Sequence, residues 1–235
     1  MKEIPLLHED SFCMIFNKPS GLPVQGGEGV KFSLDSWLSE NFSPRPFLVH
    51  RLDKDTSGLI LVAKTREAAR YYSGLFAGKN GGKNKTAKKY YLGVCSGIPE
   101  AQSGVISSGL KTPGKGKMKT EKDAETRYRL LTSGSTGFVP CSLLELELKT
   151  GRTHQIRRHL LRFGHPILGD DKYGDFLLNK KLKKAFVLKH MLLHASRLIL
   201  PSFSVPPLEL DLKAPLPEYF LSFLEAANIP FNISP

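Results

Sequence analysis

The sequence predicts an α+β fold with a mixed, mostly antiparallel sheet flanked by helices and loops. Three observations lead to this prediction. Segments with strand character dominate the first two thirds of the 235 residues, and helical patterns lie between them without regular alternation. Neither an internal repeat of about 20–50 residues nor a Ser/Pro-rich linker divides the chain.

The strands are predicted from β-forming residues that alternate or bunch together. In the clearest of them, Leu144, Leu146 and Leu148 fall on one face while Glu145 and Glu147 fall on the other. Five segments have this character: Phe12–Phe16, Leu59–Val62, Tyr90–Val94, Thr126–Leu131 and Ser142–Leu148.

The helices are predicted from apolar residues at spacings of three and four. Residues 66–77 place Ala69, Tyr72 and Phe76 on one stripe, and residues 153–163 do the same with Ile156, Leu160 and Phe163. Gly164 is well placed to end the second helix. A third stripe of Phe220, Phe223 and Leu224 follows Pro215 and Pro217.

Composition excludes several protein classes. The N-terminus has no apolar run suited to a signal peptide, and no apolar stretch is long enough to span a membrane. Three cysteines lie far apart without a CxxC pair, which excludes a disulfide framework or a zinc ribbon and fits a reducing cytoplasm. We therefore expect a cytoplasmic protein without a membrane partner.

The net charge of +12 favours a polyanionic partner such as nucleic acid. Three clusters hold five lysines each, at residues 79–89, 111–122 and 180–190. The first two contain glycine and lack apolar periodicity, so we expect mobile loops there. Together the clusters are typical of a phosphate-backbone footprint, although lysines in loops also serve solubility alone.

The run HRLDKDTSG at residues 50–58 leads directly into the apolar LILVA. Charged groups beside a buried strand need partners or a function. In an extended loop Arg51 and Asp53 point the same way, so that the guanidinium can hold the carboxylate ionised. Thr56 and the residues after it supply a turn into the strand. The structural alternative is that Asp53 only caps a turn or pairs with Arg51.

A second polar run, TGRTHQIRRH, opens the helix predicted at 153–163 and is followed by GHPILGDDKYG. Basic side chains at a helix N-terminus can bind phosphate or an acidic side chain. The spacing of His154 and His159 lacks the HExxH zinc pattern, so no metal is expected. A solvated basic face is the alternative for Arg158 and Arg162, but it suits the tight TGRTHQIR block less well.

Five ordered motifs together resemble the RluA family of RNA pseudouridine synthases: HRLDKDTSG, KYYLGVCSG, KDAETRY, TGRTHQIRRH with GHPILGDDKYG, and LLHASRL. The opening HEDSFCMIFNKPSGLPVQ also resembles that family's first strand and Asn-Lys-Pro turn. The resemblance covers about residues 8–200 and implies a pseudouridine synthase-like fold. We expect residues 1–235 to form a single catalytic domain without a separate N-terminal accessory RNA-binding domain. Gly93 replaces the family's usual Ala, a mild change.

The resemblance implies isomerisation of specific uridines in RNA to pseudouridine, without a cofactor or metal. Asp53 would be the essential carboxylate, Arg157 its salt-bridge partner, and Tyr91 the ring that stacks on uracil and helps move the C5 proton. Arg51 would take the space of the extruded nucleotide, while Ile167 and Leu168 would form an apolar floor. The remaining substrate-binding candidates are Thr56, Arg152, His154 and Gln155.

Two other functions compete with this interpretation. A catalytically silent RNA-binding protein has no need of Asp53, because a carboxylate repels phosphate. A glycosidase usually needs two cooperating carboxylates, and Asp55 has no identifiable acid role. The expected partner is a stem-loop of ribosomal or transfer RNA, since proteins read RNA sequence mainly where bases are unpaired. We expect the protein to be a monomer.

Overall fold

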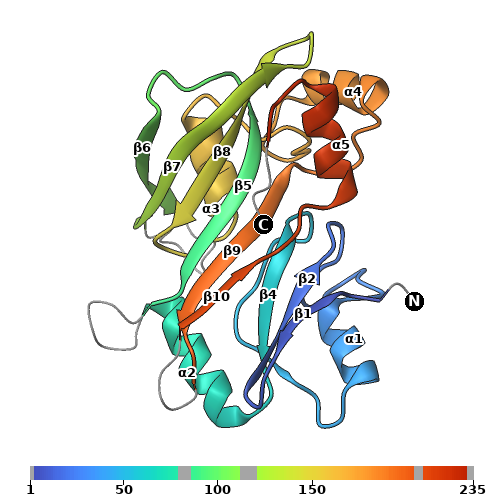
Figure 1. Ribbon diagram of the computed structural model, residues 1–235, viewed down its shortest axis with the longest axis vertical. Coiled ribbons are helices and arrows are strands. Elements are labelled where there is room, and N and C mark those ends of the chain that lie inside the picture. Colours follow the sequence, from blue (N-terminus) through green and yellow to red (C-terminus); the bar gives the residue numbers. More distant parts are fainter. Residues whose placement is uncertain (1–2, 79–85, 112–120, 204–208, 232–235) are drawn as a thin grey trace. The chain divides into compact units, whose positions relative to one another are not determined.

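The computed structural model describes residues 3–78, 86–111, 121–203 and 209–231. The chain forms two compact units (Figure 1). The first comprises Met1–Lys89 and His194–Leu216, and the second comprises Tyr90–Leu193 and Pro217–Pro235. Most of the lysine-rich segments 79–89 and 111–122, which the sequence predicts to be loops, lies outside the described residues.

The first unit is built on a mixed sheet. Strand β4 (Ser57–Ala63) lies between β2 (Cys13–Lys18), which is antiparallel to it, and β9 (Leu193–Pro201), which is parallel to it. Strands β1 (Leu6–Glu9), β3 (Phe47–Leu48) and β10 (Glu209–Lys213) add to β2, β4 and β9 respectively, all antiparallel.

The helices of this unit cover the two faces of β2. Alternate side chains, Cys13 and Ile15, join a buried cluster with Tyr72 of α2 (Arg66–Ala77), whereas Phe16 makes ring contacts with Trp37 of α1 (Leu34–Asn41). Strand β4 is buried along its whole length. Burial on both faces explains why its sequence is continuously apolar instead of alternating.

Gly58 at the start of β4 permits a close approach of two strands. Its φ is +109°, and a Cβ there would lie 2.2 Å from the carbonyl oxygen of Ala195 in β9. A side chain is therefore excluded both by the backbone conformation and by the neighbouring strand. Glycine is required at the position where the HRLDKDTSG loop becomes a strand.

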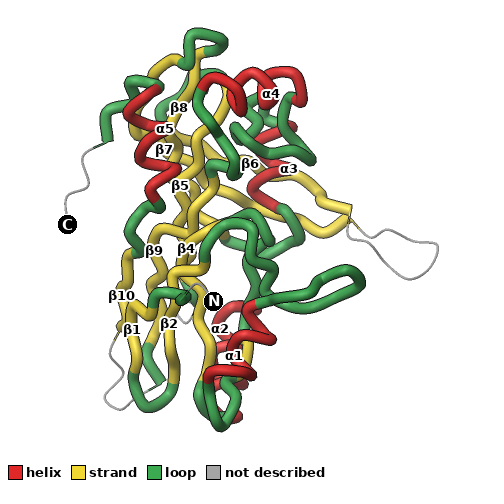
Figure 2. Tube along the Cα trace, turned by 90° about the vertical axis from the view of Figure 1, so that its right-hand side faces the viewer, coloured by secondary structure: helices red, strands yellow, loops and turns green. Residues whose placement is uncertain are grey.

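The second unit holds a sheet with the order β5-β8-β7-β6, in which β7 is antiparallel to both of its neighbours. The strands are β5 (Lys88–Ser96), β6 (Ser103–Lys111), β7 (Glu121–Ser135) and β8 (Pro140–Leu148). Figure 2 shows the helices of this unit (red) around its strands (yellow). They are α3 (Gln155–Arg162), α4 (Phe176–Ala185) and α5 (Glu218–Ala226).

The predicted α+β class and the mostly antiparallel sheet are confirmed. All five predicted strands exist, helix 66–77 has the predicted bounds, and Gly164 ends α3 with a φ of +84°. The helix predicted at 153–163 is shorter, because His154 adopts a left-handed backbone conformation and the helix begins after it. Helices α1 and α4 were not predicted. None of the helices in the described ranges is long and apolar enough to cross a membrane.

Candidate active site

The loop that carries Asp53 joins β3 to β4 in the first unit, and its two ends are anchored by histidines. At its start, His50 Nε2 accepts a hydrogen bond from the backbone N–H of Leu61 at 2.9 Å, and the ring stacks on Phe76. Desolvation lowers the pKa of His50 to about 3. The imidazole is thus neutral near pH 7, as an acceptor nitrogen requires.

At the end of the loop, the buried His194 of β9 contacts the first residue of β4. Its Nδ1 lies 2.9 Å from Ser57 Oγ, and its Nε2 lies 3.4 Å from the carbonyl oxygen of Ala214. Burial lowers the pKa of His194 to about 4. A neutral ring with its proton on Nε2 satisfies both contacts, because it then accepts from Ser57 and donates to Ala214.

The middle of the loop is held by the end of β2 and the residues that follow it. The carbonyl oxygen of Lys54 accepts hydrogen bonds from Gly21 N at 2.9 Å and from Lys18 Nζ at 3.1 Å. Ser20 Oγ donates to the carbonyl oxygen of Asp55 at 2.7 Å. These bonds fix the backbone on the C-terminal side of Asp53, whose side chain is half-buried. The segment NKPSG therefore acts as a brace for the aspartate loop.

Lys18 is the centre of this brace and is fully buried. Its ammonium also donates to the carbonyl oxygens of Pro19 at 2.9 Å and Leu22 at 2.8 Å, so three carbonyls surround it. Burial lowers the pKa of Lys18 to about 7, against the opposing influence of the Asp55 and Asp53 carboxylates. The charge of this lysine is consequently sensitive to pH near neutrality.

This burial predicts a pH-dependent stability. Folding lowers the pKa of Lys18 from 10.5 to about 7, so between these values the unfolded chain binds more protons than the folded one, and the contribution of this group to stability rises with pH. We expect urea unfolding to show this difference. From pH 7 to pH 9, the free energy of unfolding of the native chain should rise by on the order of 2 kcal/mol relative to that of Lys18→Met.

Lys31→Met, at an exposed lysine, is the matched control. The difference between the native chain and this control should stay constant over the same pH range. A constant difference for Lys18→Met as well would contradict a pH-sensitive charge in the brace.

Arg51 and Thr56 have different surroundings. Arg51 is exposed, and its suggested pairing with Asp53 stays a prediction. An exposed guanidinium gains little from a pair that water screens. Thr56 is buried, and its N–H donates to the carbonyl oxygen of Asp53 at 3.2 Å. This bond closes the predicted turn.

In the second unit, helix α3 is fastened to β7 by Gln155. The side-chain amide nitrogen, Nε2, donates to the carbonyl oxygen of Glu125 and to Thr126 Oγ1, at 2.9 and 3.1 Å. Its Oε1 accepts from Thr150 Oγ1 and from Arg152 N, at 2.7 and 3.1 Å. Because an amide has two donor hydrogens and two acceptor lone pairs, this side chain is saturated by protein groups.

Arg157, two residues further along α3, forms a buried ion pair with Asp170. The distances are 2.7 Å from Nε to Oδ2 and 2.8 Å from Nη2 to Oδ1, and the two side chains are 6% and 1% exposed. This two-point grip uses one edge of the guanidinium and fixes its plane. Sequence reasoning missed Asp170, although the acidic GDD within a basic block was a signal for it.

Asp170 is itself held in place. Its Oδ1 also accepts from the N–H groups of Lys172 and Tyr173, at 2.9 and 3.0 Å. Burial alone would raise the pKa of Asp170, but the Arg157 guanidinium and these N–H groups outweigh it and hold the pKa below 3.8. The carboxylate therefore stays charged near neutral pH. Its contribution to stability is lost only as the pH falls through this lowered pKa.

Two further basic candidates lie at the start of α3. His154 Nδ1 is 3.0 Å from the hydroxyl of Tyr173, whose ring also lies 5.0 Å from the Arg157 guanidinium carbon. Arg152 is half-buried, and its Nε is a buried donor without a hydrogen-bond partner among the described residues. The structure thus brings Arg152, His154, Gln155 and Arg157 together around one helix start.

Tyr91, Ile167 and Leu168 are all buried in the second unit. Tyr91 lies in β5, and the end of the same strand pairs with the segment of the two apolar residues. Cys95 forms a bridge with Ile167, and Leu168 N donates to the carbonyl oxygen of Val94 at 2.9 Å. The residues proposed as the floor are therefore attached to the strand that carries Tyr91.

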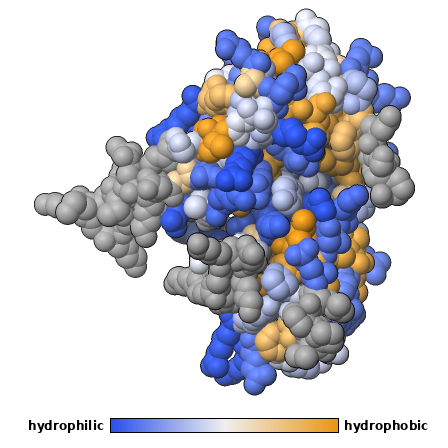
Figure 3. Space-filling model, turned by 60° about the vertical axis from the view of Figure 1, so that its left-hand side comes forward, coloured by the Kyte–Doolittle hydropathy of each residue, from blue (hydrophilic) through white to orange (hydrophobic). Residues whose placement is uncertain are grey.

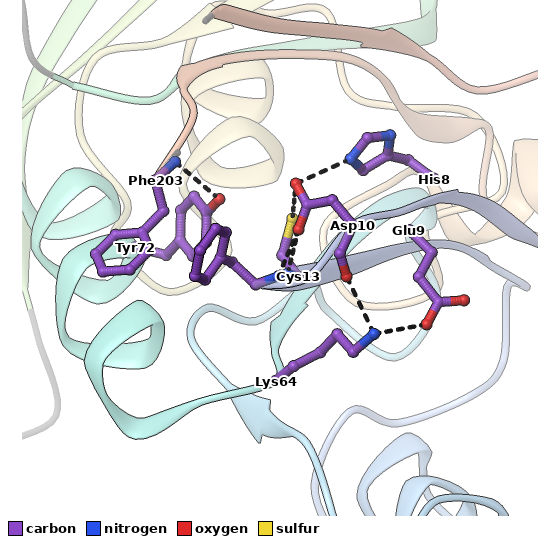
Figure 4. Close-up of polar contacts among 8 residues, drawn as sticks. His8, Glu9, Asp10, Cys13, Lys64, Tyr72 and Phe203 are labelled. Atoms are coloured by element: carbon purple, nitrogen blue, oxygen red, sulfur yellow. Dashed lines mark hydrogen bonds and ion pairs between the residues drawn. The ribbon is translucent and has the colours of Figure 1, made fainter. Parts of the chain in front are cut away.

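A group of possible metal ligands, His8, Asp10 and Cys13, lies at the turn between β1 and β2 (Figure 4). Asp10 Oδ1 accepts from the N–H groups of Phe12 and Cys13, and Oδ2 lies 3.3 Å from His8 Nε2. Burial raises the pKa of the Cys13 thiol to about 12. The hydrogen bonds of Asp10 close the hairpin between β1 and β2.

Comparison with known proteins bears directly on these motifs. A family model described as RNA pseudouridylate synthase matches residues 13–162. The chain belongs to the RNA pseudouridylate synthase family. Enzymes of this family isomerise uridine to pseudouridine in RNA, and the resemblance of the sequence to RluA-type members is confirmed.

The relatives of this chain within the family agree. It is 36% identical to ribosomal large subunit pseudouridine synthase C of Vibrio cholerae over 90% of its own length, and 38% identical to the protein of that name of Rickettsia typhi over 92%. The chain spans 65% and 69% of the lengths of these two relatives. The solved structure of human RNA Pseudouridylate Synthase Domain Containing 4 matches with a TM-score of 0.75 and 28% identity, over 97% of this chain and 94% of that one.

Proposed function

We propose that this chain converts uridine to pseudouridine in RNA with Asp53 as its catalytic carboxylate. The observation that carries the proposal is the brace around the aspartate loop. Three residues at and just after the end of β2, Lys18, Ser20 and Gly21, bind the carbonyl oxygens of Lys54 and Asp55. A carboxylate on so strongly fixed a backbone is pre-organised for one position on a substrate.

In this proposal Asp53 acts as nucleophile or base while the bond between uracil and ribose breaks and the ring turns to rejoin through C5. Arg157 is its salt-bridge partner. The Asp170 grip supports that role, because it orients the guanidinium while using two of its five N–H donors. Tyr91 stacks on the uracil and moves the C5 proton.

The other candidates take supporting roles. Arg51 occupies the space of the extruded nucleotide, for which its exposure suits it. Arg152 and His154 bind the RNA backbone, and Thr56 shapes the loop from within. The saturated amide of Gln155 suits a positioning role better than RNA contact. Ile167 and Leu168 form the apolar floor.

We further propose a stem-loop of large-subunit ribosomal RNA as the substrate, bound by a cytoplasmic monomer in which residues 1–235 serve as one catalytic domain. The names of the relatives in Vibrio and Rickettsia favour ribosomal over transfer RNA. No cofactor or metal is part of the proposed reaction, because an isomerisation needs neither an oxidant nor an energy source.

The test uses RNA from cells that lack the gene. Ribosomal and transfer RNA are incubated separately with the purified chain, treated with carbodiimide, and read by reverse transcription for new stops at pseudouridine. New stops in large-subunit ribosomal RNA are expected. Stops confined to transfer RNA would overturn the substrate, and the absence of stops in both RNA classes would overturn the enzymatic function.

A further inference from the structure

Helix α4 presents an unusual outer face. Phe176 and Leu177 in its first turn are 73% and 70% exposed, whereas Asn179 and Leu182 on the opposite side are buried. Hydrophilic side chains (blue) cover much of the face of the molecule in Figure 3, with apolar ones (orange) in small patches. Phe176 and Leu177 are the two most exposed large apolar side chains among the described residues, and they are adjacent at one helix start.

Lysines continue this face along the helix. Lys180 and Lys184 follow Phe176 and Leu177 at spacings of three, four, seven and eight, which place them on the same side of α4. Both are exposed, and neither forms an ion pair within the described ranges, unlike Lys183, which pairs with Asp171. A favourable interaction with the helix dipole explains basic residues in the last turn. It does not explain the apolar pair ahead of them.

A second aromatic ring extends the surface. The half-exposed Phe138 in the turn between β7 and β8 lies beside α4, with Lys181 Nζ 5.9 Å from the centre of its ring. We define the α4 face as Phe138, Phe176, Leu177, Lys180, Lys181 and Lys184. It combines two aromatic rings and an aliphatic side chain with three lysines.

We propose that the α4 face binds an unpaired segment of the RNA substrate, outside the residues assigned to catalysis; this inference rests on the proposed function. Bases stack on exposed aromatic rings irrespective of sequence, while lysines bind the phosphates between them. A second copy of this chain is a poorer occupant, because two-fold pairing through this face would bring its lysines against their own copies. An RNA strand neutralises the same charges.

The inner side of α4 connects this face to the ion pair described above. Asn179 Oδ1 accepts from Gly169 N at 3.0 Å, and its Nδ2 donates to the carbonyl oxygen of Asp170 at 2.9 Å. Asp170 in turn grips Arg157. RNA bound on the outer side of α4 is thus held by a helix whose inner side is hydrogen-bonded to Asp170, the residue that orients Arg157.

Two double variants separate stacking from charge. The probe is a fluorescein-labelled oligouridylate of about twelve nucleotides, within the usual reach of single-strand sites, and its affinity is measured by fluorescence anisotropy from low to moderate NaCl. Phe176→Ser/Leu177→Ser should weaken binding about tenfold, the loss of one stacked base, with the salt dependence unchanged. Lys180→Gln/Lys184→Gln should reduce the slope of log affinity against log salt by about 1.4, or about 0.7 per lost phosphate contact.

Matched controls carry the same changes elsewhere. Leu6→Ser/Leu221→Ser alters two other exposed apolar residues, and Lys31→Gln/Lys213→Gln removes two other exposed lysines. Both controls should bind the probe as the native chain does. Equal losses in variants and controls, or no loss in either, would overturn the proposal and leave the face to a protein partner or to solubility.

The synthase assay keeps this inference separate from the proposed function. At saturating ribosomal RNA, both α4 variants should form pseudouridine at the native rate, with a higher KM. A lower kcat at unchanged KM would place the defect in catalysis and overturn an RNA-docking role. If the native chain forms no pseudouridine at all, the proposed function fails, while the anisotropy measurement still decides whether the α4 face binds RNA.

Discussion

Asp53→Asn is expected to abolish pseudouridine formation, with a rate loss on the order of 10⁴-fold or more, as for removal of a nucleophile in other enzymes. An amide is neither a nucleophile nor a base at neutral pH. The change preserves size, and the bonds that brace the loop involve the backbone of Lys54 and Asp55, so the loop should keep its conformation. Single-turnover assays on ribosomal RNA with carbodiimide detection measure the loss.

Asp55→Asn is the matched control, because it makes the same change two residues away. Its activity should remain within about tenfold of the native chain, since its carbonyl oxygen still accepts from Ser20. RNA affinity should be similar in both variants. Pseudouridine formation at the native rate by Asp53→Asn would remove this residue from the reaction.

Asp170→Asn is expected to lower the free energy of unfolding by about 3–5 kcal/mol, the usual cost of removing one partner from a buried ion pair. The introduced amide would turn an N–H₂ group or a weaker acceptor towards Arg157, and burial prevents water from replacing the lost carboxylate. Urea unfolding at pH 7 measures the change. Activity should also fall, because the guanidinium of Arg157 loses its two-point grip.

Asp171→Asn provides a sharp control at the adjacent position. That carboxylate pairs with Lys183 across exposed surface, with its side chain 67% exposed. Exposed ion pairs contribute about 0–1 kcal/mol, so stability should hardly change. Similar stability losses in the two variants would mean that the buried pair contributes no more than an exposed one.

The elements that follow from local patterns were predictable from the sequence. Helix 66–77 was predicted with the observed bounds because its apolar stripe of Ala69, Tyr72 and Phe76 lies within the segment itself. Helix α4 was overlooked because its buried side consists of Asn179 and Leu182, and one of these is polar. The polar Asn179 thus interrupts the buried side, and the exposed Phe176 and Leu177 lie away from it.

In the candidate site, too, some residues could be predicted from local sequence patterns and others only from the fold. The amino-acid order alone identified the family and drew attention to Asp53, Tyr91 and Arg157, because the motifs that carry them are contiguous runs of side chains. The fold was needed to reveal that Lys18 binds a carbonyl 36 residues away and that Arg157 grips Asp170. Such contacts follow from burial, since a charge removed from water must find its partner wherever the chain brings one near, and no local spacing encodes that partner.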